Sequence, residues 1–346
     1  MAPPTLVQPS PAPGRRRRAH ACVVVAAASA LVLASCGAQR QEAGAPELTL
    51  RLGHTYGVGS LQDRASQRLA ENVAEASDGR VEIELYPAGQ LGSWEDMQEG
   101  LEFGAVHMVV ESVGSLERYT DLAAVEGVPF IYDSPEQFLA VWDGPLGEEI
   151  IEAIRDDTGF LLLGSMYRGG RVLNSDRPVE RLEDLRGLKL RVPTQQTYLD
   201  TWTALGASPT PLALSEVFAA IEQGAVEGQE NPVDVVRYNS FYEVAPYVAM
   251  TNHLYGNFHF QTWGEAHDSW PADLRAVIDD EVDEVSDWYR ETSLAEQEEN
   301  VEFLRAEGVT FTEVDREEWR EATSEVLEEA DPQVQEWVRR IQDGQA

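Results

Sequence analysis

From residue 47 onwards, the order of apolar and polar residues predicts an alternation of strands and helices. Residues 48–53 and 81–85 alternate one by one between apolar and polar, as half-buried strands do, and residues 106–110 are apolar enough for a buried strand. Between these strands, apolar residues recur at helical spacing after Ser60 and again after Ser93, and both serines stand in the N-cap position. This close succession of three strands and two helices indicates a parallel α/β unit.

The pattern recurs further along the chain. We expect a short helix near residues 183–185, a strand over residues 188–192, and helices over residues 195–205 and from Ser215 to residue 222. Residues 271–307 are strongly helical and contain no interior glycine or proline, and this stretch is longer than one compact lobe needs. The chain is therefore predicted to form two α/β lobes with a cleft between them, braced by a long C-terminal helix.

The first 36 residues have the features of a targeting segment. Arg15 to Arg18 supply a positively charged region, and residues 22–33 form an apolar run that is too short for a membrane span, which needs ~20 apolar residues. Small residues then precede Cys36, as in lipoprotein signals, in which the cysteine becomes lipidated and is the new N-terminus. The alternative is an ordinary signal peptide that is cut near Ala34.

These features predict where the mature protein is located. Residues 1–36 are expected to be a lipoprotein signal peptide, and residues 37–46 a flexible tether of small and polar residues. One acylated cysteine attaches a protein to a membrane surface without making it span. We therefore expect an exported protein, lipid-anchored at the cell envelope and facing outward, toward the periplasm or the cell surface. No cysteine follows Cys36, so the mature fold has no disulfide and no thiol nucleophile.

The charge balance narrows the range of partners. The chain has 26 basic and 61 acidic residues, a formal net charge of −35. Without the four leader arginines, 22 basic residues face 61 acidic ones, which brings the mature chain near −39. Phosphate binding needs basic patches, so nucleic acid is excluded as a natural partner. Two explanations stay open: a soluble, self-repelling surface, or adaptation to high salt, where the Debye length falls to ~3 Å and repulsion is screened.

An ordered set of motifs in the middle of the chain is more specific. The segments are Gly187-Leu-Lys-Leu-Arg191-Val-Pro193, Leu205-Gly-Ala-Ser-Pro-Thr-Pro211, Ser215-Glu-Val-Phe218 and Gln223-Gly-Ala-Val-Glu-Gly-Gln-Glu-Asn-Pro232, with Tyr86-Pro-Ala-Gly-Gln-Leu-Gly92, Tyr242-Glu-Val244 and Thr251-Asn-His253 outside that series. In this order and spacing, the set resembles the substrate-binding proteins of tripartite ATP-independent periplasmic (TRAP) transporters, in the C4-dicarboxylate-binding superfamily. The resemblance covers roughly residues 48–307, and is greatest to members that bind sialic acid or sugar acids.

The resemblance implies a periplasmic-binding-protein-like fold that closes over a carboxylate held by arginine. The position that matches this arginine is Arg191, at the carboxyl end of its strand, where open α/β sheets bind ligands; its guanidinium can hold both carboxylate oxygens. Arg171 matches a second family arginine, and Asn231 the asparagine of Glu-Asn-Pro. Glu111 matches an acidic position that accepts ligand hydroxyls in some relatives, and Thr194 follows the Arg-Val-Pro motif. For each residue, a structural or solvent-exposed role is the alternative.

Departures from the family pattern bear on the ligand. Thr194 stands where sialic acid-binding members usually have asparagine, and Leu214 replaces the aromatic residue that they often carry. The arginine they use on the polyol tail is missing near Glu111. These differences disfavour sialic acid itself. Because Glu111 would repel a second carboxylate but accept hydroxyl groups, a uronate or another hydroxylated monocarboxylate is expected in preference to a C4-dicarboxylate.

The expected partners are this small carboxylate and the TRAP membrane subunits. We expect no catalytic residue, cofactor or metal, because the six histidines form no ligand pair of the H-E-x-x-H kind and the sequence contains no G-x-S-x-G elbow. The first lobe is predicted to comprise residues 47–168 and about 257–296, and the second residues 169–256 and about 297–346. An ABC-type binding protein, the ligand-sensing lobe of a receptor and an extracytoplasmic enzyme with an unrecognised site remain alternatives, because fold does not fix function.

Overall fold

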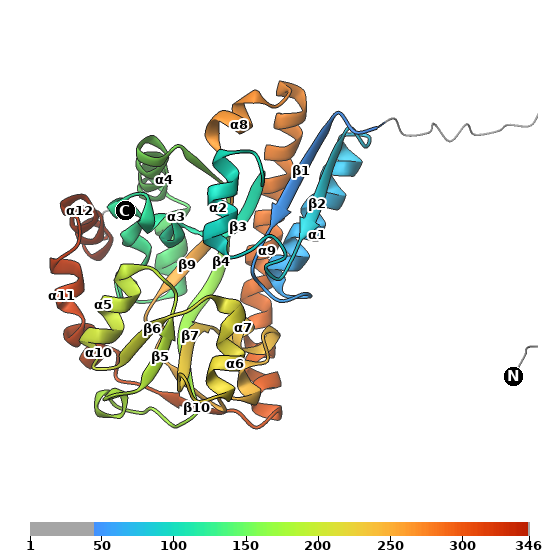
Figure 1. The fold of residues 1–346 in the computed structure, drawn as a ribbon. Coiled ribbons are helices and arrows are strands. Elements are labelled where there is room, and N and C mark those ends of the chain that lie inside the picture. The colour runs from blue at the N-terminus through green and yellow to red at the C-terminus, as the bar shows by residue number, and fades with distance from the viewer. Residues whose placement is uncertain (1–44, 345–346) are drawn as a thin grey trace, which may run out of the picture. The chain divides into compact units, whose positions relative to one another are not determined.

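The structure is a computed structural model that describes residues 45–344 of the chain (Figure 1). Its strands are β1 (Leu48–Gly53), β2 (Val81–Tyr86), β3 (Met108–Ser112), β4 (Phe160–Ser175), β5 (Lys189–Val192), β6 (Ser208–Pro211), β7 (Gly228–Pro232), β8 (Tyr247–Met250), β9 (Tyr255–Trp263) and β10 (Thr310–Glu313).

The α-helices alternate with these strands. They are α1 (Leu61–Ala76), α2 (Trp94–Glu102), α3 (Pro135–Trp142), α4 (Pro145–Thr158), α5 (Gln196–Ala204), α6 (Val217–Glu222), α7 (Val233–Tyr238), α8 (Gly264–Ser269), α9 (Ala272–Ala306), α10 (Arg316–Ala322), α11 (Ser324–Glu328) and α12 (Pro332–Gln342). Short 3-10 helices are η1 (Val113–Arg118), η2 (Asp121–Glu126), η3 (Leu182–Leu185), η4 (Leu214–Glu216) and η5 (Phe241–Glu243).

The predicted α/β unit near the N-terminus is confirmed, together with its helix caps. β1 pairs in parallel with both β2 and β3. The Ser60 hydroxyl accepts a hydrogen bond from the backbone N–H of Asp63 at the start of α1. At α2, Ser93 and Asp96 form a reciprocal capping box. At the later helix the prediction was wrong in detail: Ser215 lies inside η4 and does not cap α6.

One long strand, β4, connects the two halves of the sheet. The strand order is β2-β1-β3-β9-β4-β7-β5-β6, and β8 pairs with β4 and β10. The first residues of β4 pair antiparallel with β9, and its last residues pair antiparallel with β7 and β8. The pairing with β9 shifts register between Tyr167 and Gly170, where Gly169 has a φ of +84° that L side chains rarely adopt. Arg168 lies within this irregular segment and lines the site described below.

The long C-terminal helix is confirmed as α9. It packs against β4, against α1 of the first half of the sheet and against α7 of the second (Figure 1). Its buried side chains, among them Leu274, Val282 and Leu304, belong to a hydrophobic core that also contains residues of β1, β3 and α7. A single apolar core therefore continues along the helix and braces both halves of the sheet.

The end of the chain packs against elements of both predicted lobes. β10 pairs with β8, in the second half of the sheet. However, the buried side chains of α12, including Trp337 and Ile341, share a core with Phe138 of α3 and Ile150 of α4. We therefore propose that α12 belongs to the first lobe, and that the second lobe ends before it.

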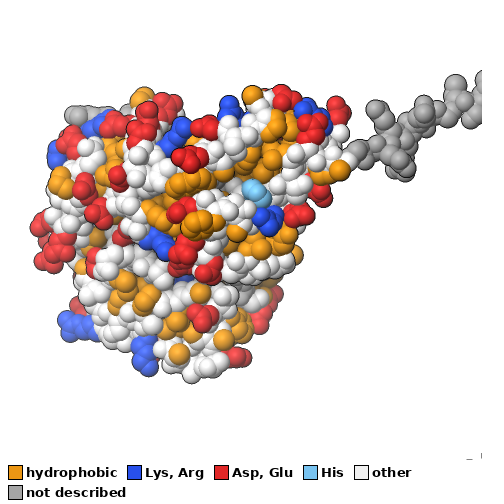
Figure 2. All heavy atoms as spheres, turned by 45° about the horizontal axis from the view of Figure 1, so that its top comes forward, with side chains coloured by type: hydrophobic (Ala, Val, Ile, Leu, Met, Phe, Trp, Pro, Cys, Tyr) orange, Lys and Arg blue, Asp and Glu red, His pale blue; other side chains and the backbone are white. Residues whose placement is uncertain are grey.

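The surface reflects the acidic composition. On the face shown in Figure 2, acidic side chains are spread widely and outnumber basic ones. Within residues 45–344, no helix combines the length and the apolar character that a membrane crossing requires. The predicted signal peptide, Cys36 and the tether up to residue 44 lie outside the described residues.

Candidate functional site

A cavity of about 40 Å³ lies between side chains from both halves of the sheet. Four of the five predicted ligand-binding residues line it: Glu111 of β3, Arg171 of β4, Arg191 of β5 and Asn231 of β7. β5 and β7 run parallel, so their carboxyl ends bring Arg191 and Asn231 to the same edge, where open sheets bind ligands. The complete lining is Thr55, Tyr56, Trp94, Glu111, Ser112, Arg168, Arg171, Arg191, Pro193, Gln195, Tyr198, Leu214 and Asn231.

Arg191 is a buried cation without a carboxylate partner among residues 45–344. Its side chain is 3 % exposed, and its Nε and Nη2 both donate to the backbone oxygen of Leu212, at 2.9 and 2.7 Å. Burial lowers the pKa of Arg191 to about 10, although the nearby Glu230 acts in the opposite direction. The second terminal nitrogen, Nη1, makes no hydrogen bond within the described chain, so it can bind an anion in the cavity.

Arg171, by contrast, is already neutralised. Its Nε donates to Oε2 of Glu230 at 2.5 Å, and its Nη2 donates to Oε1 at 2.6 Å, a bidentate arrangement. His253 approaches the same carboxylate at 3.2 Å through Nε2. Burial alone would raise the pKa of Glu230, but Arg171 and His253 outweigh it and lower that pKa to about 2. Arg171 therefore enters the cavity as part of an ion pair.

A third arginine, Arg168, lines the same cavity and was not predicted. Its Nη1 lies 3.8 Å from Oε1 of Glu126, and its guanidinium lies 4.3 Å from the ring centre of Phe258. The backbone N–H of Gly114 also donates to Glu126. Burial raises the pKa of Glu126, while the charge of Arg168 opposes that shift. Of the three cavity arginines, only Arg191 lacks a carboxylate partner in the described residues.

Glu111, on β3 in the first half of the sheet, contributes a carboxyl group to the cavity. The side chain is 6 % exposed, and it accepts hydrogen bonds from the hydroxyl of Tyr56 and the backbone N–H of Ser112, both at 3.1 Å. Burial raises the pKa of Glu111 to about 7, against the lowering effect of Arg168 and these hydrogen bonds. Near neutral pH, Glu111 is thus able both to accept and to donate a hydrogen bond.

The remaining two predicted residues differ in position. Asn231 is buried and lines the cavity, where its Nδ2 donates to Oε1 of Gln229 at 2.7 Å. Thr194 does not line the cavity: it is exposed, and its hydroxyl donates to Oε1 of Glu95 at 2.8 Å. The structure therefore places Thr194 at the rim, away from the other four predicted residues.

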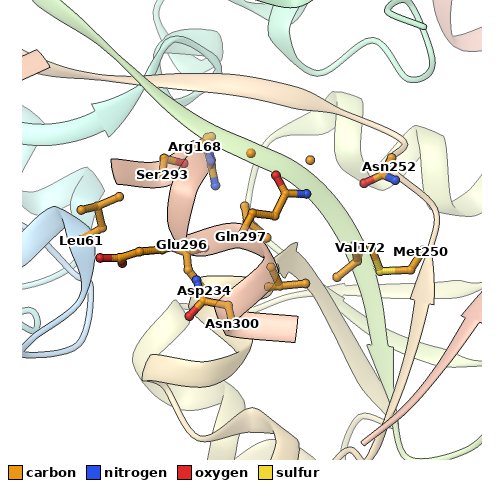
Figure 3. A pocket seen from close by; sticks show the side chains of 14 residues that line it. Leu61, Arg168, Val172, Asp234, Met250, Asn252, Ser293, Glu296, Gln297 and Asn300 are labelled. Atoms are coloured by element: carbon orange, nitrogen blue, oxygen red, sulfur yellow. The ribbon is translucent and has the colours of Figure 1, made fainter. Parts of the chain in front are cut away.

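Neighbouring hollows bear on ligand size. One of about 220 Å³ shares Thr55, Trp94 and Leu214 with the arginine cavity, so the space there extends beyond 40 Å³. Another cavity, between β4, α7 and α9, is lined by Asp234, Glu296, Asn300 and other residues and contains part of Arg168 (Figure 3). With about 20 Å³, it has room for about one water molecule, so it is too small for an organic acid.

Two site residues that sequence reasoning missed, Glu230 and His253, lie within the motifs that carry the resemblance, and a third, Arg168, lies three residues before the predicted Arg171. Arg168 is the first arginine of the Arg168-Gly-Gly-Arg171 segment, and Glu230 precedes Asn231. His253 closes the Thr251-Asn-His253 motif, and its contact with Glu230 supports the ion pair of Arg171. Tyr56 and Trp94 follow β1 and open α2, and no motif indicated them. Within the described residues, no cluster of histidine, cysteine or acidic side chains is arranged to hold a metal.

Comparisons with known proteins identify the family of the chain. Residues 52–333 match the family profile DctP, bacterial extracellular solute-binding protein, family 7. A solute-binding protein from Roseobacter denitrificans is 35% identical over 277 residues, which cover 79% of this chain and 84% of the relative. The sialic acid-binding periplasmic protein SiaP of Vibrio cholerae is 30% identical over 290 residues, 83% of this chain and 89% of the relative.

Solved structures that resemble this fold are substrate-binding proteins as well. A crystal structure of a TRAP periplasmic solute-binding protein from Roseobacter denitrificans with bound L-galactonate has a TM-score of 0.82 and 30% identity, covering 86% of this chain and 99% of that one. A sugar acid-binding protein from Advenella mimigardefordensis in complex with galactonate has a TM-score of 0.81 and 28% identity, covering 86% and 97%. Both confirm the expected two-lobe fold.

The family match spans most of the chain, and two relatives reach at least 30% identity over most of their own length. The family comprises transport proteins, so the expectation that the chain is not an enzyme is confirmed. The chain belongs to family 7 of the bacterial extracellular solute-binding proteins and is an extracytoplasmic substrate-binding protein of the TRAP type.

Proposed function

We propose that this protein captures a hydroxylated monocarboxylate of the sugar-acid class and delivers it to a TRAP-type transporter, with Arg191 binding the carboxylate. The observation that carries the proposal is the charge of the cavity. Arg168 and Arg171 face Glu126 and Glu230, whereas Arg191 has only the Leu212 carbonyl as a partner in the described chain. A buried charge is favourable only when it is paired, and one ligand carboxylate would supply the missing partner.

The other walls favour hydroxyl groups over a second carboxylate. Glu111 would repel a second anionic group when ionised, but its oxygens accept from hydroxyls. Asn231 has an amide oxygen and nitrogen that can bind a ligand carboxylate or hydroxyl. The ligands bound to two relatives, L-galactonate and galactonate, each carry a single carboxylate and several hydroxyls, which supports a ligand of the same chemical class here. In this proposal Arg171 orients the site through Glu230, and Thr194 lies outside the first contacts of the ligand.

The proposal extends to location and shape. We propose that cleavage before Cys36 leaves this residue lipidated, so that the protein is held at the membrane surface and faces outward. The small-residue sequence before Cys36 and the extracytoplasmic family support this. In cells, Cys36→Ala should release the protein into the soluble envelope fraction; a variant that stays with the membrane would contradict the lipid anchor. The two lobes are proposed to close over the solute, with β4 and α9 connecting them.

A panel of ligands in a thermal-shift assay tests the function. The panel contains uronates, aldonates, sialic acid, C4-dicarboxylates, 2-oxo acids and neutral sugars. A ligand at ~100 times its dissociation constant should add ~3 kcal/mol of stability, which corresponds to several degrees in melting temperature. We expect sugar acids to raise the melting temperature most. Stabilisation by dicarboxylates alone would overturn the role of Glu111, and stabilisation by neutral sugars alone would overturn the role of Arg191.

A further inference from the structure

Two acidic side chains of the first lobe reach across to the start of α5 in the second lobe. Oε1 of Glu117, in η1, accepts a hydrogen bond from the backbone N–H of Thr197 at 2.9 Å. Oε1 of Glu95, in α2, accepts from the hydroxyl of Thr194 at 2.8 Å. The partners are 80 and 99 residues apart in the sequence, so both contacts depend on how the two lobes meet.

Glu117 acts as a helix cap supplied from another part of the fold. α5 begins at Gln196, so the N–H of Thr197 is among the first N–H groups of the helix, which have no partner inside it. Gln195, at the N-cap position, makes no side-chain hydrogen bond to them. The carboxylate of Glu117 therefore replaces the missing cap, and its negative charge lies near the positive end of the helix dipole.

This cap is connected to the solute site through the helix itself. Tyr198 follows Thr197 and lines the arginine cavity, as does Gln195. Tyr198 also lies against Arg171, whose guanidinium is 5.2 Å from the ring centre. Fixing the first turn of α5 against the first lobe therefore fixes one wall of the cavity, and separating the lobes breaks the cap.

We propose that Glu117 is a positioning residue that retains the solute: by capping α5 across the cleft, it stabilises the closed arrangement of the lobes and slows solute release. The Glu95–Thr194 hydrogen bond supports the same closure at the exposed rim. The inference rests on the proposed function, in which the lobes close over a solute. It explains why Thr194, which the family pattern had suggested as a ligand contact, points away from the cavity.

Release kinetics test the proposal with L-galactonate as the probe, or with the acid that gives the largest thermal shift. Glu117→Ala should raise the dissociation rate about fivefold, the factor that corresponds to a lost cap of ~1 kcal/mol, with less than a twofold change in the association rate. Glu117→Gln keeps an acceptor oxygen and should stay within about twofold of the wild type. Asp121→Ala is the matched control, because Asp121 lines the same hollow as Glu117 and Thr194 but makes no side-chain hydrogen bond to any residue that the structure describes.

A second pair of variants tests the rim contact. Thr194→Val removes the hydroxyl that reaches Glu95, and Thr203→Val removes a hydroxyl of α5 that bonds within its own helix. The first should raise the dissociation rate and the second should not. An unchanged dissociation rate in Glu117→Ala, or equal losses in Glu117→Ala and Glu117→Gln, would overturn the capping role.

Hydrogen exchange separates this inference from the proposed function. The N–H of Thr197 has no partner inside α5, so its protection reports on Glu117. With both proteins saturated by solute, and hence closed, this amide should exchange at least about twofold more slowly in the wild type than in Glu117→Ala; equal rates would overturn the inference. If the wild-type protein binds no acid of the panel, the proposed function fails and the inference with it; if it binds one and the exchange rates of Thr197 are equal, only the inference fails.

Discussion

Replacing Arg191 by methionine should weaken solute binding at least ~30-fold without destabilising the empty protein. Burial lowers the pKa of this guanidinium to about 10, well below its ordinary value, so at neutral pH its charge costs the folded state ~3 kcal/mol. Methionine removes that cost and nearly preserves the side-chain volume. It also leaves the Leu212 carbonyl without its two donors, which costs ~1–3 kcal/mol. The two effects nearly cancel, and the empty variant should be as stable as the wild type or slightly more so.

The affinity for the solute should fall, although the stability of the empty protein is kept. Removing one partner of a buried charge pair costs ~2–5 kcal/mol, which lowers the affinity at least ~30-fold. Arg191→Lys keeps the charge but loses the planar donor pair, so it should also bind more weakly than the wild type. The assay is urea unfolding of each empty protein, followed by titration calorimetry with the acid that stabilises the wild type most.

The stability of the empty variant makes this test specific. A residue that only supports the fold should lose stability and affinity together when it is replaced. Arg191→Met should lose affinity alone, and its stability advantage should disappear above pH 10, where the wild-type guanidinium begins to lose its proton. An empty variant that is destabilised by several kcal/mol, yet still binds with less than a threefold change in affinity, would refute the assignment of Arg191.

Three further predictions follow from the same charges. The pKa of Glu111 is raised from 4.5 to about 7, so its contribution to stability is full below pH 4.5 and is lost as the pH rises through 7. In urea unfolding, the stability of Glu111→Gln relative to the wild type should therefore rise by ~3 kcal/mol between pH 4 and 8. A difference in stability that does not change with pH would contradict this. Glu230→Gln should destabilise the protein by ~3–5 kcal/mol, whereas the double variant Arg171→Met/Glu230→Leu should regain most of that loss. The association rate of an anionic solute, measured by stopped flow, should rise between about 0.05 and 1 M salt, because the net charge of −35 repels it; a falling rate would contradict this.

Much of the fold could be predicted because local signals and the final fold agree. The caps at Ser60 and Ser93 and the helix α9 follow from neighbouring residues. β4 was missed, because both of its ends are buried in different parts of the sheet and its middle contains Gly164, Gly169 and Gly170. A strand with these glycines lacks the alternation on which the prediction depends.

The site was predicted only in part, for a related reason. The resemblance identified Arg191 as the arginine that holds the carboxylate and Arg171 as a second arginine of the site, because both occur in matching motifs. It could not show that Glu230 neutralises one of them and not the other, since β4 and β7 become neighbours only after folding. The position of Thr194 likewise depends on Glu95, which lies 99 residues away in the sequence.

The acidic surface and the cavity have opposite electrostatic effects on an anionic solute. At long range the net charge of −35 repels it, but exposed charges are screened over ~8 Å at physiological salt. Inside the cavity the effective dielectric is lower and screening is weak, so the single unneutralised guanidinium of Arg191 dominates over a few ångströms. If Arg168 and Arg171 were also unpaired, the empty cavity would hold three like charges, and its stability would depend on continuous occupancy. Pairing two of them with Glu126 and Glu230 leaves one unpaired positive charge while Glu111 is protonated, and a monocarboxylate can neutralise that charge when it binds.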